Sequence, residues 1–190
     1  EPTPWEAYTY DANDNGGRTR PQDPRGEGCQ NHWNTPESIV TDALGRTIKA
    51  TERNRSRQAG GSWSVSTEEY VTTSAYDVRG NLLTVTDALG RVAFRYVYDL
   101  TPSGDDEDQG ARVLRTEQLD AGLRRVIFDA AGSEVERRDS KGALILQPYD
   151  SLNRPSRLWA RDEGGSQLSL RERVDYGDGG DPGQSTSARA

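Results

Sequence analysis

The side chains that could do chemistry in this sequence are, first, its recurring aspartates. Two carboxylates held about 5 to 9.5 Å apart across a substrate could carry out acid–base hydrolysis. Here, however, the aspartates recur singly, each followed three residues later by Gly or Asn, as in Asp77 and Gly80. An Asp in this place accepts a backbone N–H two residues on, and Gly adopts a positive φ at low cost. The aspartates therefore predict tight turns, not a catalytic pair.

Two acidic segments have the composition of a cation site. The segment from Asp11 to Gly16 has oxygen-bearing side chains at alternate positions and Gly at the sixth, which resembles the first half of a calcium loop. Its twelfth position is Gln22, where a bidentate Glu is required, and no helical pattern flanks it. This favours an eroded repeat turn. The acidic run 105–108 could also gather a cation, but consecutive carboxylates in a loop are ordinarily solvated.

Cys29 and His32 are the only cysteine and the only histidine of the chain. A Cys–His pair can act as nucleophile and base, but a spacing of three inside a Gly-rich stretch does not define that geometry. One cysteine excludes an internal disulfide, and one histidine excludes a site with several imidazole ligands. We expect no catalytic residue, no bound metal and no cofactor.

The aspartates belong to a repeat with a period of about ten residues. Its pattern is an aromatic or small residue, Asp, two or three turn-forming residues, and Gly or Asn. The pattern predicts a tight turn between antiparallel strands, of type I with a glycine bulge. Eroded copies begin at Tyr10, Thr41, Tyr98 and Leu119. The turn residues of the clearest copies are Asp77, Gly80, Asp87, Gly90, Asp129, Gly132, Asp139, Gly142 and Asp150.

Apolar residues alternate with other residues between the turns. In 92–98, Val92, Phe94 and Tyr96 fall on one face of a strand, and Ala93 and Arg95 fall on the other. A period of two predicts strands, and no window has a helical stripe. The predicted fold is all-β: tandem antiparallel hairpins that form an extended curved sheet.

Composition limits the other possibilities. Leu, Ile, Val and Phe number 31 of 190 residues, a fraction low enough to raise disorder as an alternative. The net charge of -7 is small for this length, and the 8 Tyr and 4 Trp recur at repeat positions, which favours order. So few apolar residues favour a thin sheet over a compact globule. The acidic balance gives no electrostatic attraction to nucleic acid.

The predicted organisation is a repeat segment over 1–176 and a flexible Gly/Asp/Ser tail over 177–190. Polar, Gly-containing stretches near 16–35, 53–64 and 101–111 predict loops inserted between strands. No apolar run predicts a membrane span, and no secretory signal is visible in this segment. Because neither end has the pattern of a cap, we expect a piece of a longer protein.

The sequence YDVRGNLLTVTDALGR at 76–91 resembles the RHS (YD) repeat, and 4–14 and 129–161 more narrowly resemble the B component of insecticidal toxin complexes and related bacterial RHS toxins. The resemblance covers most of residues 4–162. It implies a β-sheet strip that spirals into a hollow shell around a toxic C-terminal effector. It also implies a secreted protein whose partners are flanking repeats, a closing region, the effector cargo and a toxin-translocation subunit.

The chain departs from that family's pattern in one respect. The Asp-Pro-x-Gly-Leu signature of the shell-closing region, with its self-cleaving aspartates, is missing, and 23–26 and 181–183 match it only in part. No protease or effector role is therefore transferred. The predicted function is a non-enzymatic wall segment of a shell. The alternative is an extracellular module that binds carbohydrate or a cell surface through exposed Tyr and Trp.

Overall fold

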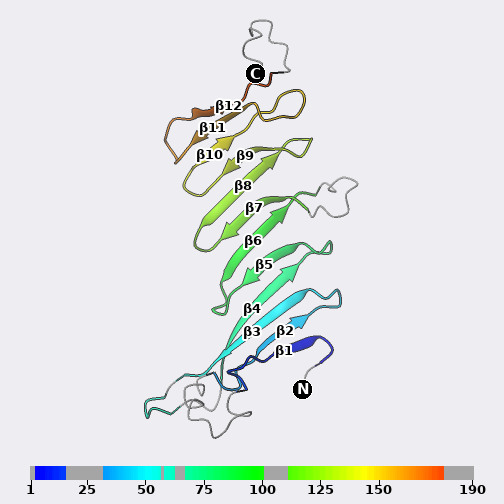
Figure 1. Ribbon diagram of the computed structural model, residues 1–190, viewed down its shortest axis with the longest axis vertical. Helices are drawn as coiled ribbons and strands as arrows, with labels where there is room; N and C mark the ends of the chain where they lie inside the picture. Colours follow the sequence, from blue (N-terminus) through cyan, green and yellow to red (C-terminus); the bar gives the residue numbers. More distant parts are fainter. Residues whose placement is uncertain (1–2, 16–31, 57, 63–66, 101–110, 178–190) are drawn as a thin grey trace. The chain divides into compact units, whose positions relative to one another are not determined.

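The computed structural model describes residues 3–15, 32–56, 58–62, 67–100 and 111–177, which form strands and no helix (Figure 1). The strands are β1 (Glu6–Thr9), β2 (Glu37–Thr41), β3 (Thr47–Asn54), β4 (Glu68–Tyr76), β5 (Leu82–Thr86), β6 (Val92–Tyr98), β7 (Val113–Gln118), β8 (Gly122–Phe128), β9 (Glu134–Arg138), β10 (Leu144–Leu146), β11 (Arg157–Arg161) and β12 (Ser169–Arg173).

The strands follow one another in the sheet in the order in which they occur in the chain, from β1 to β12. The described pairs are antiparallel, for example β4 with β5 and β8 with β9. Alternating apolar residues and turn residues about every ten positions dictate this arrangement, because a short turn can join only antiparallel neighbours. The predicted all-β fold of tandem hairpins is confirmed.

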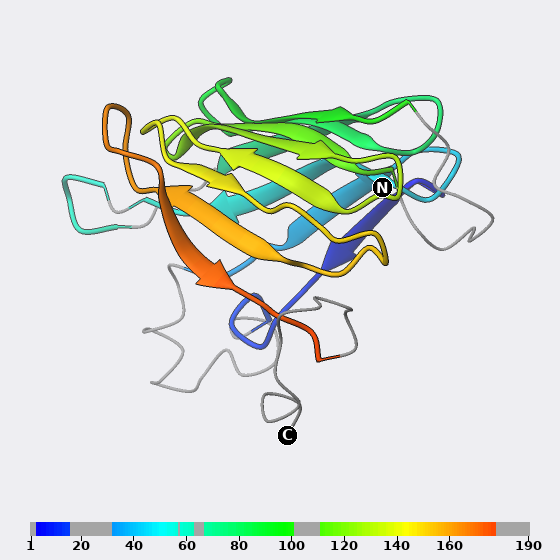
Figure 2. The same cartoon turned by 90° about the horizontal axis from the view of Figure 1, so that it is seen from above.

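The chain divides into two units, 1–95 and 96–190. Within each unit a strand contacts only the strands before and after it in the chain. From β8 to β12 the strands turn progressively, as Figure 2 shows, which is the ordinary twist of neighbouring strands. Each unit therefore has the nearest-neighbour construction of a repeat protein.

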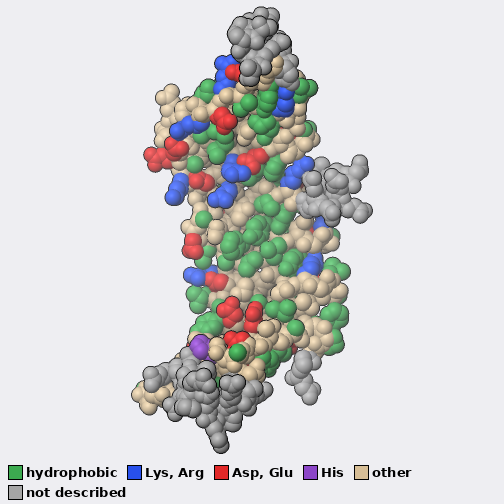
Figure 3. All heavy atoms as spheres, in the orientation of Figure 1, with side chains coloured by type: hydrophobic (Ala, Val, Ile, Leu, Met, Phe, Trp, Pro, Cys, Tyr) green, Lys and Arg blue, Asp and Glu red, His purple; other side chains and the backbone are tan. Residues whose placement is uncertain are grey.

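Neither unit has a conventional core. Among the described residues, Leu144 is the one hydrophobic residue that is buried, at 8% exposure. The other buried residues are polar: Asp14, Ser38 and Thr51. On the face of the second unit seen in Figure 3, hydrophobic side chains lie among Arg and acidic side chains instead of forming one patch. With so little burial, order in these hairpins must depend largely on backbone pairing and on the turns.

Most of the predicted inserts lie outside the described residues, as do 178–190 of the predicted tail and the acidic run 105–108. Where the insert at 53–64 was expected, β3 continues through Arg53 and Asn54. Arg53 is anchored there because its guanidinium donates to the carbonyl of Pro36 (2.8 Å) and to the Ser38 hydroxyl (3.1 Å). These contacts tie the end of β3 to β2 and extend the strand beyond the boundary that its polar sequence indicates.

Candidate functional site

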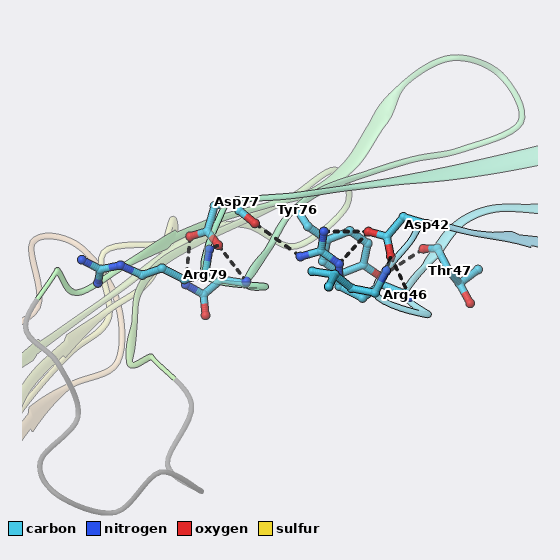
Figure 4. Close-up of polar contacts among 8 residues, drawn as sticks. Asp42, Arg46, Thr47, Tyr76, Asp77 and Arg79 are labelled. Atoms are coloured by element: carbon cyan, nitrogen blue, oxygen red, sulfur yellow. Dashed lines mark hydrogen bonds and ion pairs between the residues drawn. The ribbon is translucent and has the colours of Figure 1, made fainter.

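The most regular chemical feature of both units is the Asp-centred turn. At Asp77 the backbone N–H donates to the carbonyl of Asn81 (2.9 Å), and the Gly80 N–H donates to the Asp77 carbonyl (3.1 Å). The Asp77 Oδ1 accepts the N–H of Arg79 (2.8 Å), as Figure 4 shows, and it also accepts the N–H of Asn81 (2.9 Å). This is a three-residue hairpin loop with a glycine bulge. One carboxylate oxygen thus satisfies two backbone donors of the turn.

The same backbone bonds recur in the turns that begin at Asp42, Asp87, Asp129, Asp139 and Asp150. Each of these aspartates also accepts, through Oδ1, the N–H of the residue four positions on. The residue in the glycine position has a positive φ in every case: Gly45, Gly80, Gly90, Gly132, Gly142 and Asn153. All nine turn residues singled out from the sequence therefore lie in these reversals, each at its own turn.

The second carboxylate oxygen contacts the side chain four residues on. Oδ2 of Asp42 accepts Nε of Arg46 (2.7 Å), and the pairs Asp87–Arg91 and Asp150–Arg154 repeat this at 2.8 Å. The side-chain hydrogen bonds from Arg46, Asn81 and Arg91 are the main reason that the pKa values of Asp42, Asp77 and Asp87 lie below the ordinary value. For Asp150 the main cause of the lowered pKa is the backbone N–H of Arg154. A carboxylate held ionised by its own turn is a poor general acid.

The turns fall into two classes, which we call even turns and odd turns according to the number of the strand they follow. The even turns begin at Asp42, Asp77, Asp99, Asp129 and Asp150, and the odd turns include those at Asp87, Asp139 and Asp162. Four of the five even turns have Tyr or Phe before the Asp, whereas these odd turns have Thr or Arg. Since alternate turns of an antiparallel meander share one edge of the sheet, the aromatic residues of each unit lie along a single edge.

Three tyrosines of the two units are bonded to the preceding even turn of their own unit. The Tyr76 hydroxyl donates to the carbonyl of Thr47 (3.0 Å), as Figure 4 shows. The Tyr149 hydroxyl donates to Glu134 (3.1 Å) and that of Tyr176 to Pro155 (2.9 Å). In all three cases the acceptor is the residue five positions after the Asp of the preceding even turn. The Tyr-Asp pairs at 76–77 and 149–150 therefore each join one even turn to the turn before it, and Tyr176 makes the same bond without a following Asp.

Arginines reinforce the same edge. The guanidinium of Arg46 lies 4.8 Å from the ring centre of Tyr76 and donates to the Asp77 carbonyl (3.3 Å). In the second unit Arg154 lies 4.0 Å from the Tyr176 ring and Arg112 lies 5.6 Å from the Phe128 ring. Such cation–π contacts contribute roughly 0.5–1 kcal/mol each at exposed sites. Three of the five even turns, those at Asp42, Asp99 and Asp150, thus supply an arginine that covers the next aromatic residue of the edge.

Arg112 fills this role although residues 101–110 separate it from Asp99. The Asp99 N–H donates to the Arg112 carbonyl at 2.8 Å, which is the bond that closes the regular turns. The insertion therefore enters an even turn without removing its closing pair.

The odd turns contact one another through small residues. An added Cβ at Gly122 would lie 2.6 Å from the Ser140 hydroxyl, which donates to the carbonyl of Ala121 (3.1 Å). An added Cβ at Gly142 would lie 2.6 Å from backbone atoms of Gly164, whose N–H donates to Lys141 (2.9 Å). At Gly142 backbone packs directly on backbone, and at Gly122 backbone packs on a small side chain, so both glycines allow close approach as well as a positive φ.

The calcium-like segment uses its carboxylates locally. The Asp11 Oδ1 accepts the N–H groups of Asn13 and Asp14, both at 2.8 Å. The buried Asp14 accepts the N–H of Asp11 (2.9 Å) and the N–H and hydroxyl of Thr35 (2.9 and 3.0 Å). Oxygens that face N–H donors are poorly placed to bind a cation, although Gly16 and Gln22 lie outside the described residues.

Cys29 lies outside the described residues and His32 lies within them, so the structure does not give the geometry of this pair. Within the described ranges no group of three or more His, Cys, Asp or Glu side chains could hold a metal ion. Over the same ranges no helix is long and apolar enough to cross a membrane.

Sequence reasoning treated all the turns as one class and missed the division into even and odd. The signal was present in the sequence: Tyr or Phe precedes Asp77, Asp99, Asp129 and Asp150, and not Asp87 or Asp139. The contacts of Arg46, Arg112 and Arg154 with aromatic rings along one edge were also missed.

No family model matches the chain, and no curated protein matches it. Solved structures do resemble it. The crystal structure of TcdB2-TccC3-TEV superposes with a TM-score of 0.70 at 21% identity, over 92% of this chain and 8% of that chain. TcdB2-TccC3-Cdc42 gives a TM-score of 0.69 at 20% identity with the same coverage. A Photorhabdus luminescens Tc holotoxin pore that carries a TccC3 mutation gives 0.70 at 20% identity. The predicted resemblance to toxin-complex components is thus confirmed for the fold, over a chain that spans about 8% of their length.

Proposed function

We propose that the chain is a non-enzymatic wall segment of an RHS-type shell that encloses a C-terminal toxin effector. The observation that carries the proposal is the single sheet of neighbour-only hairpins, with one buried hydrophobic residue in its described part. A globular enzyme needs a core to hold its site rigid, and none of the described turns gathers the aspartates into one place. The fold likeness to a short stretch of much longer Tc toxin chains supports the same conclusion.

The proposed mechanism is containment. Backbone hydrogen bonds between successive strands leave no gap through which a chain could pass, and each Asp-centred turn fixes where its strand reverses. The aspartates and glycines of the turns act as structural residues in this proposal. The partners are the flanking repeats, the closing region, the effector and a translocation subunit, in a secreted protein.

The experiment compares two proline substitutions in the full-length protein. Val85 pairs with Ser74 of β4 on one side and with Phe94 of β6 on the other. Proline has no N–H, so Val85→Pro removes a bond of the sheet in the middle of the wall. Val78 is 98% exposed at the second position of a type I turn, where proline is favoured, which makes Val78→Pro the matched control.

Each protein is treated with protease, and the survival of the C-terminal effector inside the particle is measured. We expect the effector to survive in the wild type and in Val78→Pro, and to be degraded in Val85→Pro. An effector that is digested at once in the wild type would contradict containment.

A binding module is the second candidate, and exposed aromatic side chains favour it. Trp5 is 53% exposed, Tyr10 46% and Tyr70 44%. If these residues recognise a glycan or a cell surface, the full-length protein binds it saturably and Tyr70→Ala lowers the affinity. Saturable binding that Tyr70→Ala abolishes, together with an effector that the wild-type protein does not protect from protease, would favour this second function over containment.

A further inference from the structure

A row of arginines crosses one face of the second unit. Arg115 of β7 lies opposite Arg125 of β8, which in turn lies opposite Arg138 of β9. Residues directly opposite each other on antiparallel strands point to the same face, with Cβ atoms about 4.5–5.5 Å apart. Like charges in these positions repel each other. Stability of the sheet therefore does not explain this row, and a function for it should be sought.

Two arginines of the row are neutralised by acids on their own strands. Arg115 pairs with Glu117 at 2.7 Å, and Arg138 pairs with Glu136. Arg125, between them, is exposed and has no ion pair within the described part of the chain. The unmatched positive charge of the row is thus located on its central residue.

A groove of about 560 Å³ adjoins the row, and Arg115, Arg125 and Arg138 all line it. The acids of its lining are Asp99 and Glu136, of which Glu136 is paired with Arg138, and Glu117, which is paired with Arg115, lies outside the lining. The lining also includes Val126, Ile127 and Phe128, and Ile127 is 49% exposed. The groove therefore combines one available cation with exposed apolar surface.

We infer that this groove docks a segment of the enclosed effector that carries one carboxylate next to an apolar side chain. The carboxylate binds Arg125, whose planar guanidinium can donate two parallel hydrogen bonds to it. The apolar side chain covers Ile127. The inference rests on the proposed function, and it assigns the face that bears Arg125 to the inside of the shell. Charge complementarity identifies the occupant, because a basic or wholly apolar segment would leave Arg125 unmatched.

The experiment places a photo-crosslinking amino acid in the full-length protein, in place of Ile127 in one version and of Arg124 in the other. Arg124 is an exposed neighbour on the same strand, opposite Thr116, and its side chain points to the other face. After irradiation of intact particles, mass spectrometry identifies the crosslinked peptides. We expect effector peptides that contain Asp or Glu from position 127 and none from position 124.

The charge is tested separately with Arg125→Gln, and with Arg124→Gln as its control. A hydrogen bond to a charged group contributes enough that its loss should lower the crosslink yield from position 127 about tenfold. Arg124→Gln should leave the yield unchanged. An unchanged yield in Arg125→Gln would overturn the role of the charge.

Protease protection of the effector is measured on the same particles, so the two proposals can fail separately. If the effector is protected but crosslinks only from position 124, or if position 127 crosslinks only to other shell segments, this inference is wrong and containment stands. If the wild type does not protect the effector, containment itself is wrong.

Discussion

The even turns and the odd turns share one Asp-centred bend but contact their neighbours differently. Even turns are joined by long side chains: Arg46 covers Tyr76, and the Tyr76 hydroxyl reaches back to Thr47. Odd turns are joined by close backbone contact, as between Gly142 and Gly164. Side chains adjust to a change in spacing, whereas packed backbone does not. In the second unit an even turn carries the insertion 101–110, and we expect the packed odd turns of this unit to fix the spacing of its hairpins; in the first unit the long connections follow the odd strands β1 and β3 instead.

The largest loss of folding stability is expected at acid pH, because protonation of the turn aspartates weakens even turns and odd turns alike. The folded-state pKa values of Asp42, Asp77, Asp87 and Asp150 lie below the ordinary value of 3.8. The unfolded chain therefore takes up protons more readily, so the stabilisation is complete above the ordinary pKa and is lost as the pH falls through the lowered values. Far-UV circular dichroism should stay constant from pH 7 to about pH 5 and change below about pH 4. A transition centred near pH 6 would point to another group.

Glycine substitutions test the contacts between turns next, with Gly90, an odd-turn glycine with open space around it, as the reference. Gly90→Ala meets no atom within 4 Å and should cost the strain of its positive φ alone, about 1–2 kcal/mol. Gly142→Ala would also press on Gly164 backbone, which adds about 1–3 kcal/mol. Gly132→Ala should fall between, because its clash is with the movable guanidinium of Arg112. Hydrogen exchange of the turn amides measures each local opening free energy. Equal costs at Gly142 and Gly132 would remove the distinction between rigid backbone contact and adjustable side-chain contact.

Arginine substitutions give the next effect. Arg46→Ala removes the ion pair with Asp42, the bond to the Asp77 carbonyl and the contact with the Tyr76 ring. We expect a loss of about 1–2 kcal/mol. The control, Arg91→Ala, removes an ion pair within a single odd turn and should cost about 0.5 kcal/mol or less. The measurement is exchange at Asp77 and Asn81 for the first variant and at Asp87 and Arg91 for the second. If Arg91→Ala costs as much, the arginines act within turns and not between them.

The smallest effect is expected from a gained hydroxyl. Phe128 occupies the place that Tyr76 and Tyr149 take in their turns, and the equivalent carbonyl acceptor is that of Val113. Phe128→Tyr should add this bond and stabilise the turn by about 0.5–1.5 kcal/mol. The reverse change, Tyr149→Phe, should cost a similar amount. Slower exchange at Asp129 and Ser133 in the first variant checks the prediction, and faster exchange there would contradict it.

The turns and strands were predictable because their causes are local. Asp129 and Gly132 lie within four residues of each other, so their bond pattern can be inferred from spacing alone. The likeness to toxin components could be recognised from the same repeats. The ring contacts of Arg112 and Arg154 could not be predicted in this way. Arg112 lies 16 positions before Phe128, and Arg154 lies 22 positions before Tyr176. The end of β3 at Asn54 could not be read from local sequence either, since Arg53 is held by Pro36, which precedes β2, and by Ser38 of β2.

The sequence by itself determined an all-β chain whose reversals are set by Asp, Gly and alternating apolar residues, because those preferences act over a few bonds of backbone. The tertiary structure alone decided which turns become neighbours, and therefore that aromatic residues gather on one edge, that Gly142 meets Gly164, and that Arg115, Arg125 and Arg138 stand in one row. These contacts depend on register between strands. A shift of one residue would turn every side chain of a strand to the other face, so only paired strands can specify them.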